Sequence, residues 1–361
     1  VAKMSKAPSA LRQLRGGMLP FPEAFLAIIT TQSEDQPTGI FRNELNKARR
    51  IRDGKQPGAM LPVLYEFPAE IQRSPGAEKG RELWRNPEIW HLVTPNAGKS
   101  IEIPRLVEEM QTAAATSDEE LRAWCSQHLN IEIGLALSAD GWPGADFWED
   151  NADETMTTLD ALLERSEVVT VGIDGGGLDD LLGVSVVGRE IGTGRWLHWG
   201  HAWMHPIALE RRKSEEQLYR DLEADGDLTI VEEIGDDVEE VADVVEKCEK
   251  AGLLDELGVD SAGIGSIVDA IVARKVDESR IVSIPQGWKL TGAIHTTERK
   301  LAGRLLLHCG QRLFAWSAGN AKVEPRGNAI MITKQTAGRA KIDPLMSLFN
   351  AVALMGLNPK A

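Results

Sequence analysis

The sequence predicts an α/β fold built on a mixed sheet flanked by helices. From about residue 167, three apolar stretches follow one another with only short connections, which predicts a meander of hairpins. Beyond them, helical and strand-like patterns alternate, as they do in sheets covered by helices. The strands are expected at 168–174, 181–190, 194–204, 228–234, 257–260, 280–287 and 328–334, and the helices at 215–226, 236–252, 264–275, 296–309 and 343–356.

The region before residue 167 has a different pattern. Apolar runs predict strands at 24–33 and 61–68. Ser117 followed by Glu120 is the signature of a capping box and predicts a helix over 117–129. A stretch rich in Gly, Pro, Asp and Trp then leads into a short helix ahead of residue 167. The expected division is a first domain over 1–150, a linker over 151–166 and a second domain over 167–361.

Composition places the chain among globular proteins. Its 361 residues are enough for two domains, each with a sizeable core. No window approaches the run of about 18 apolar residues that a membrane helix needs. The three cysteines are far apart and odd in number, which argues against a disulfide framework and a cysteine zinc site. We therefore expect a reducing, cytoplasmic setting.

Charge is unevenly distributed along the chain. The formal net charge is -15, which by itself speaks against nucleic acid as a partner. Residues 285–361, however, hold 11 Lys or Arg against 3 Asp or Glu, whereas 215–260 is strongly acidic. Because local charge governs contact with phosphates, the basic end is a candidate for binding nucleic acid. The alternative is that it forms a solvated face.

Three carboxylates occupy positions suited to a metal site. Asp174 ends the predicted strand "VVTVGID", Asp260 ends the strand "LGVD", and Asp343 precedes the last helix. Strand ends hold a side chain rigidly at the edge of a sheet. Carboxylate oxygens are the ligands that Mg²⁺ prefers, and two such ions can activate water against a phosphodiester. The sequence thus predicts an acidic cluster drawn from separate segments.

Each of these acids also has a structural alternative. Asp343 stands directly before a proline and suits a helix N-cap. Asp260 and Asp174 both precede glycine-containing turns and could serve there. Asp180 is either a fourth ligand or a turn residue, and the turn is favoured for Asp179. Lys334, nine residues before Asp343, could pair with a carboxylate, meet a phosphate, or lie solvated at a strand end.

Other motifs are weaker. "TPNAGKS" at 94–100 ends like a phosphate-binding loop, but Val93 stands where that motif needs glycine, so we reject it. The glycines after Asp174 lead into another strand rather than a helix, which disfavours a dinucleotide fold. His198 and His201 would face opposite sides of a strand, which disfavours a zinc site.

Part of the sequence resembles a known protein family. Residues from about 168 to 356 are similar to the nuclease domain of the large subunit of tailed-bacteriophage terminases, the DNA-packaging motors. The resemblance rests on the ordered pieces "GIDGGGLDDLLGVSVVG", "GVDSAGIGSIVDAI", "IPQGW", "FAWSAGNAKV" and "KQTAGRAKIDPLMSLFNAVALM". Each piece is short, but their order over nearly 190 residues is fairly specific.

The resemblance extends towards the start of the chain. "LAIITTQSEDQPTGIFRNEL", "LPVLYEFP", "HLNI" and "DGWPGADFWE" resemble the second half of the family's ATPase domain. "TTQS" at 30–33 matches its motif for coupling hydrolysis to movement. The family's P-loop and the acidic strand after it are expected ahead of residue 1. This sequence alone is therefore not expected to hydrolyse ATP; whether that part is truncated, lost or supplied in trans stays open.

The resemblance implies a fold, a site and partners. The fold would be a ribonuclease-H-like mixed sheet, preceded by a partial P-loop-type ATPase α/β region. Asp174, Asp260 and Asp343 would be catalytic and would hold two Mg²⁺ or Mn²⁺ ions, with Asp180 as a further ligand. The implied partners are double-stranded DNA, the portal protein, the small terminase subunit and further copies in a ring. The setting would be the cytoplasm of a host carrying a phage or prophage.

Three functions remain open at this stage. The first is a metal-dependent endonuclease that cuts double-stranded viral DNA during genome packaging. The second is a sugar-kinase or actin-like ATPase, whose first phosphate loop also reads as a strand, an Asp and glycines. The third is a non-catalytic docking fragment of a packaging motor. For the nuclease, the residues expected to contact DNA phosphates are Lys289, Arg299, Arg304 and Lys334.

Overall fold

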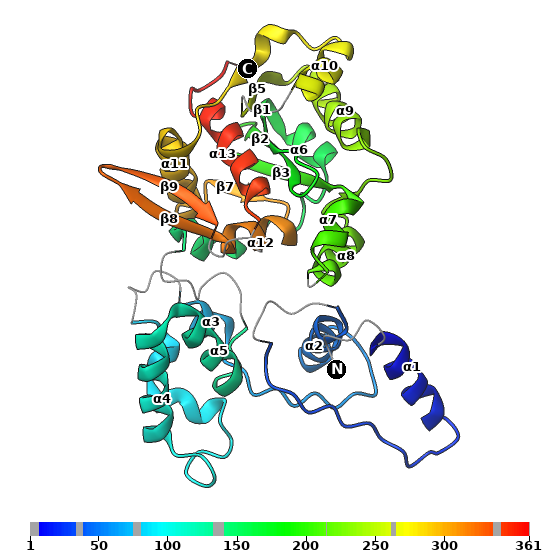
Figure 1. Cartoon of the computed structure of the whole chain (residues 1–361), viewed down its shortest axis with the longest axis vertical. Helices are drawn as coiled ribbons and strands as arrows, with labels where there is room; N and C mark the ends of the chain where they lie inside the picture. Colours follow the sequence, from blue (N-terminus) through cyan, green and yellow to red (C-terminus); the bar gives the residue numbers. More distant parts are fainter. Residues whose placement is uncertain are drawn as a thin grey trace. The chain divides into compact units, whose positions relative to one another are not determined.

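The computed structural model describes residues 7–33, 39–74, 81–132, 141–213, 215–260, 265–334 and 341–360. The chain divides into two compact units, Val1–Ala139 and Asp140–Ala361 (Figure 1). Each unit is described by itself below.

The first unit is helical over its described residues. Its α-helices are α1 (Ala7–Met18), α2 (Gly39–Arg52), α3 (Ala69–Arg73), α4 (Ile103–Thr116) and α5 (Asp118–His128), with short 3-10 helices η1 (Leu83–Arg85) and η2 (Pro87–Leu92). Buried Trp84, Trp90 and Trp124 anchor a small core between η1, η2 and α5. The predicted cap of α5 is present, since Ser117 Oγ accepts a hydrogen bond from Glu120 N at 3.1 Å.

The two strands predicted in this unit are wrong. Residues 24–33 and 61–67 form neither a helix nor a strand. Phe25, Ile29 and Leu61 are 85%, 94% and 87% exposed, whereas Phe67 is buried in the core of this unit. An extended segment becomes a strand only beside another strand, and the described residues of this unit supply none.

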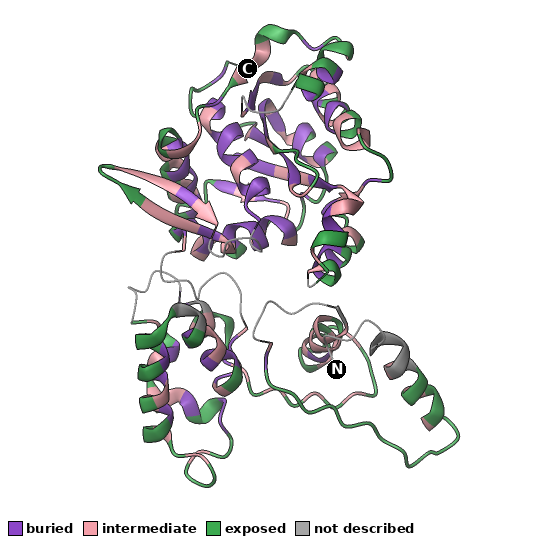
Figure 2. Cartoon of the chain, viewed as in Figure 1, coloured by how far each residue is buried: buried purple, intermediate pink, exposed green. Residues whose placement is uncertain are grey.

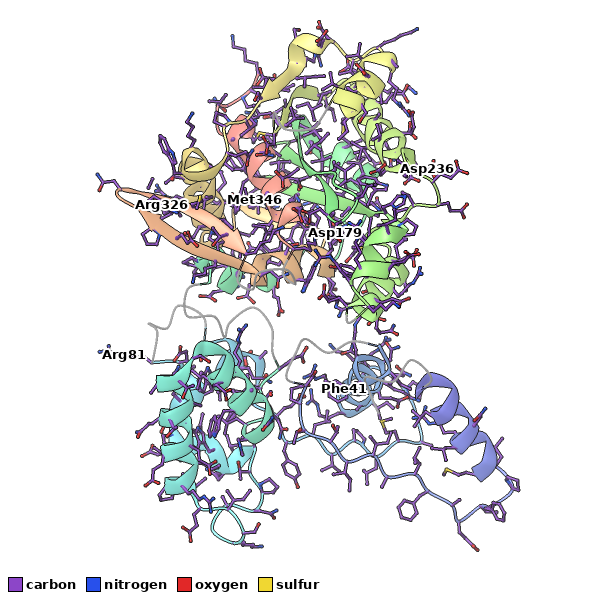
Figure 3. The ribbon with its side chains drawn as sticks, in the orientation of Figure 1. Phe41, Arg81, Asp179, Asp236, Arg326 and Met346 are labelled. Carbon is purple, nitrogen blue, oxygen red and sulfur yellow. The ribbon has the colours of Figure 1, made fainter. Side chains whose placement is uncertain are left out.

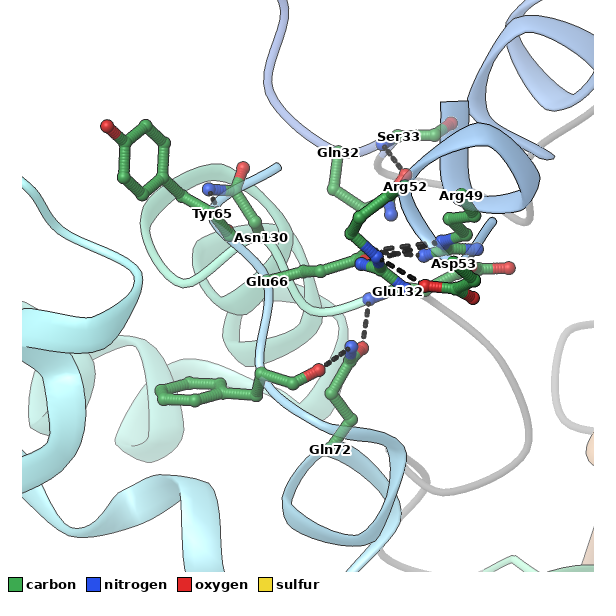
Figure 4. A network of polar contacts seen from close by, with 11 residues as sticks. Gln32, Ser33, Arg49, Arg52, Asp53, Tyr65, Glu66, Gln72, Asn130 and Glu132 are labelled. Atoms are coloured by element: carbon green, nitrogen blue, oxygen red, sulfur yellow. Dashed lines mark hydrogen bonds and ion pairs between the residues drawn. The ribbon is translucent and has the colours of Figure 1, made fainter. Parts of the chain in front are cut away.

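A polar network holds the second of these segments in place (Figure 4). Arg49 on α2 forms ion pairs with Glu66 at 2.7 Å and with Glu132 at 2.6 Å. Asn130 Nδ2 donates to the carbonyl of Tyr65 at 3.0 Å. Side-chain contacts, rather than a neighbouring strand, therefore hold residues 65 and 66 in place.

The second unit is an α/β domain. Its strands are β1 (Ser166–Gly175), β2 (Leu181–Glu190), β3 (Trp196–Met204), β4 (Leu228–Ile230), β5 (Leu254–Val259), β6 (Ile281–Ser283), β7 (Leu306–His308), β8 (Ala321–Arg326) and β9 (Ala329–Lys334). Its α-helices are α6 (Leu159–Arg165), α7 (Pro206–Arg211), α8 (Glu216–Ala224), α9 (Asp236–Lys250), α10 (Gly265–Ala273), α11 (Thr291–Ala302), α12 (Arg312–Gly319) and α13 (Asp343–Met355). Four short 3-10 helices complete it: η3 (Pro143–Phe147), η4 (Glu149–Asn151), η5 (Glu278–Arg280) and η6 (Gly287–Leu290).

Seven strands form one mixed sheet, which confirms the predicted fold class. The order is β4-β3-β2-β1-β5-β6, with β7 beside β3. The first three strands form the expected antiparallel meander, and β5 joins β1 in parallel. One predicted helix was too long: α11 ends at Ala302, and Leu306–His308 pairs with β3 as β7. β8 and β9 form a separate hairpin with Arg326 at its turn (Figure 3).

Helices cover both faces of the sheet. Val169, Val171 and Ile173 of β1 lie in a core with residues of α6, α9 and α10. Because side chains alternate along a strand, Thr170 and Gly172 face the other side, where α13 packs. Figure 2 shows α13 and the central strands as the most buried part of this unit.

Glycines let α13 approach the sheet closely. A Cβ atom at Gly172 of β1 would lie 2.0 Å from the Ser347 carbonyl oxygen, and one at Gly183 of β2 would lie 2.9 Å from Pro344 Cα. Hydrogen bonds fix the register: Thr170 Oγ1 donates to the Ala351 carbonyl at 2.9 Å. The helix is therefore seated on the backbone of the strands rather than on their side chains.

Residues 141–165 belong to the second unit, whereas the sequence predicts a boundary near residue 150 and a linker over 151–166. Trp142 packs edge-on against Phe349 of α13, with ring centroids 5.2 Å apart. Trp148 stacks on His308 at 4.5 Å. The tryptophans that made this stretch look like a connection are thus core residues of the α/β domain.

Substituting Gly172 tests the seating of α13. We expect Gly172→Ala to lower the free energy of unfolding by about 3 kcal/mol or more, because the new methyl group overlaps the α13 backbone. Urea unfolding followed by circular dichroism measures the change. Gly292→Ala on α11, where nothing lies within 4 Å, is the matched control and should change stability by less than about 1 kcal/mol. Equal stability of the two variants would contradict this account.

Candidate active site

Two acids are brought together by the parallel pairing of β1 and β5. Ile173 pairs with Val259, so the residues that follow, Asp174 and Asp260, emerge side by side at the same edge of the sheet. Asp174 alternates with Gly172 and so points to the face that α13 covers. Asp174 and Asp260 therefore lie at the ends of two neighbouring strands.

The glycines after Asp174 make a tight turn into β2. Gly175 and Gly176 have φ values of +94° and +110°, a region that disfavours other residues. A Cβ atom at Gly175 would lie 1.9 Å from the Leu181 carbonyl oxygen. The turn is short enough to carry Asp180 back over the end of β1.

Asp343 reaches the same place from α13. A Cβ atom at Gly175 would lie 3.4 Å from Asp343 Cβ, so the helix start lies against the glycine turn. Asp343 is the first residue of α13, and Ile342 occupies the cap position. Asp343 Oδ2 is buried and has no hydrogen-bond partner among the described residues. The alternative that Asp343 serves as an N-cap is therefore wrong.

Mutual repulsion shows in the pKa values of these acids. Burial, followed by the charges of Asp343, Asp260 and Asp180, raises the pKa of Asp174 well above its usual range. Burial and the neighbouring Asp180 carboxylate raise the pKa of Asp343 to about 7. The charges of Asp343, Asp260 and Asp180 therefore all act on Asp174.

Asp180 differs from the others because it is paired with lysines. Burial works to raise its pKa, but the hydrogen bond from Lys341 and the charge of Lys334 lower it below the usual value. Lys334 Nζ lies 3.7 Å from Asp180 Oδ2 and 3.9 Å from Asp343 Oδ1. Of the three alternatives for Lys334, the structure shows pairing with carboxylates.

Sequence reasoning missed Lys341. This lysine is only 2% exposed, and its Nζ donates to the Asp180 carboxylate and, at 2.7 Å, to the Asp179 carbonyl. Asp179, labelled in Figure 3, also meets Arg212, whose Nε lies 3.5 Å from its Oδ1. The available signal was the position of Lys341, two residues ahead of Asp343.

The other predicted DNA contacts lie farther away. Lys289 is in η6, which packs beside β9 through a hydrogen bond from Thr291 Oγ1 to the Ile330 carbonyl at 2.9 Å. Arg299 and Arg304 are exposed near the end of α11. Since β7 pairs Leu306 with the first residue of β3, this end lies opposite the acidic edge, about 20 Å along the strands. The structure brings only Lys334 of these four to the acids.

The carboxylates gathered at this end of the sheet are the kind of ligand that a divalent ion such as Mg²⁺ prefers. The buried, unpartnered Oδ2 of Asp343 and the raised pKa of Asp174 both indicate carboxylates that lack a cation. As the side chains stand, however, no three Asp, Glu, His or Cys residues within the described ranges are gathered closely enough to hold a metal ion. His198 is buried and His201 is partly buried, and their Nε2 atoms are hydrogen-bonded to the hydroxyl groups of Ser185 and Thr229.

The seven-stranded mixed sheet, flanked by helices and carrying acids at neighbouring strand ends, defines an α/β domain with a candidate metal site. A family model for the endonuclease domain of the terminase large subunit matches residues 84–356. The chain therefore belongs to this family, with a nuclease role in genome packaging. Membership decides against the sugar-kinase or actin-like alternative.

Solved structures include several similar proteins. The large terminase of bacteriophage HK97 has 17% sequence identity and a TM-score of 0.49, over 98% of this chain and 67% of its own. The large terminase nuclease of thermophilic phage G20c has 14% identity and a TM-score of 0.35, over 52% of this chain and 81% of its own. The same nuclease with bound magnesium has 14% sequence identity and a TM-score of 0.34, over 52% of this chain and 80% of its own.

No curated protein matches the chain. Within the ranges that the structure describes, no helix is both long and apolar enough to cross a membrane.

Asp343→Asn is expected to stabilise the metal-free protein at high pH. An unfolded aspartate titrates near pH 3.9, whereas the pKa of Asp343 in the fold is about 7, so the native state binds the extra proton between these values. Its ionisation therefore costs stability as pH rises towards 7 and beyond. With EDTA present, the variant should gain on the order of 1–3 kcal/mol at pH 8 and almost nothing at pH 4. A gain that is equal at both pH values would contradict the assignment.

Proposed function

We propose that this chain cuts double-stranded viral DNA in a reaction assisted by two divalent ions, Mg²⁺ or Mn²⁺. The observation that carries the proposal is the convergence of Asp174, Asp260 and Asp343 from three separate segments on one edge of the sheet. When bound, such ions activate the attacking water and stabilise the leaving oxygen. The acids would be their ligands, with Asp180 as the further candidate.

The chain's own residues would do the remaining work. Asp174 and Asp343 lie at the end of β1 and the start of α13, so regular elements hold their backbone in place. The side chain of Lys334 is 35% exposed beside them and can meet a backbone phosphate. Lys289, Arg299 and Arg304 are proposed to contact phosphates along the same duplex.

The first unit is proposed to be the later part of a motor domain, and the second unit to be the nuclease. It carries no fitting phosphate-binding loop, and we propose that it does not hydrolyse ATP by itself. Its outward-facing Phe25, Ile29 and Leu61 support a unit that packs against a further part of a motor. The portal protein, the small terminase subunit and a ring of copies are the proposed partners, and the host cytoplasm is the proposed setting.

Plasmid cleavage tests the nuclease. With Mn²⁺, the unmodified chain should cut plasmid DNA, and Asp174→Asn and Asp343→Asn should each lower the rate about 1000-fold or more, because each loses several kcal/mol of transition-state stabilisation. Asp243→Asn is the matched control, since this surface acid of α9 pairs with Arg274 on the opposite face of the sheet.

The remaining outcomes separate the alternatives. Absence of cleavage and of saturable Mn²⁺ binding would favour the docking fragment. Cleavage that survives both substitutions would show that the acids are wrongly chosen or that a contaminant acts.

Salt dependence tests the DNA contacts. Lys334→Ala and Lys289→Ala should each weaken duplex binding and reduce the slope of log affinity against log salt by about 1, as expected for the loss of one phosphate contact. Fluorescence anisotropy with two unrelated duplexes measures this, and the effect should be alike on both. An unchanged slope for Lys334→Ala would remove this residue from the interface.

A further inference from the structure

Lys341 is a buried cation inside the acidic site. A charged ammonium group is stable away from water only when its donors are taken up by acceptors. Lys341 meets this need through the Asp180 carboxylate and the Asp179 carbonyl. Its partners both belong to the turn between β1 and β2, whereas Lys341 itself leads into α13. The pair therefore ties the two segments that carry Asp174 and Asp343.

Lys334 provides a contrast at the same carboxylate. Its side chain is 35% exposed, against 3% for Lys341, and its contacts of 3.7 and 3.9 Å are too long for hydrogen bonds. It can turn away into solvent when another cation arrives. Lys341 has no such freedom, because leaving Asp180 would strand its charge in the interior.

We propose that Lys341 is a positioning residue that acts as a built-in cation and competes with a divalent ion for Asp180. This inference rests on the proposed metal site. Asp180 is paired with Lys341 in this structure, so a first ion would be held by Asp174, Asp260 and Asp343, whose side chains would have to close around it. An ion that also used Asp180 would bind only by displacing the ammonium group, and so would bind more weakly.

Titration of the full chain with Mn²⁺ tests the competition between Lys341 and the ion. Calorimetry and the electron paramagnetic resonance signal of free Mn²⁺ measure the binding. The unmodified protein should bind one ion tightly and a second at least about 10-fold more weakly. Lys341→Met should tighten the second step about 10-fold or more, and adding Asp180→Asn should abolish that gain. Lys247→Met, the control, removes a lysine of α9 that pairs with Asp160 at 2.7 Å, and it should shift the second step by less than about 3-fold.

Two results would overturn the proposal. One is a folded Lys341→Met protein whose second step is unchanged or weaker. The other needs no change at Lys341: Asp180→Asn should leave the first ion bound, and loss of that ion as complete as in Asp174→Asn would make Asp180 a primary ligand. Failure of the metal site itself looks different, since the unmodified chain would then bind no Mn²⁺ that Asp174→Asn removes.

Discussion

The close contact between α13 and the backbone of β1 and β2 is the constraint on which the rest of the second unit depends. Glycine at Gly172 and Gly183 removes the side chains that would otherwise hold the helix away from the sheet. Only at this distance can Asp343 at the helix start lie against the turn that follows Asp174. The packing of apolar residues and the assembly of the acids are therefore one and the same arrangement, because a helix seated higher would separate the carboxylates.

The charge balance of the site follows from this geometry. Burial, followed by the charges of the neighbouring carboxylates, raises the pKa values of Asp174 and Asp343. Two lysines offset part of the repulsion, one buried and one partly exposed. The negative charge that remains would favour binding of a cation at this end of the sheet.

Sequence reasoning succeeded where a local pattern determines the outcome. Asp174 and Asp260 were predicted because a strand ending on an acid is visible in the sequence, and parallel pairing then places such ends together. It failed where the outcome depends on a distant partner. Residues 24–33 and 61–68 have the apolar character of strands, but no pattern shows which segment lies beside them. Lys341 was missed because its value lies in a contact with Asp180, 161 residues away.

The order of the elements along the chain has a consequence for how the protein is made. Every strand of the main sheet precedes α13, and Asp343 stands at the start of that helix. During synthesis the earlier acids leave the ribosome first, yet they lack their third member until α13 has emerged and docked. The acids at this end of the sheet are therefore brought together only after α13, which follows every strand of the main sheet, has been synthesised.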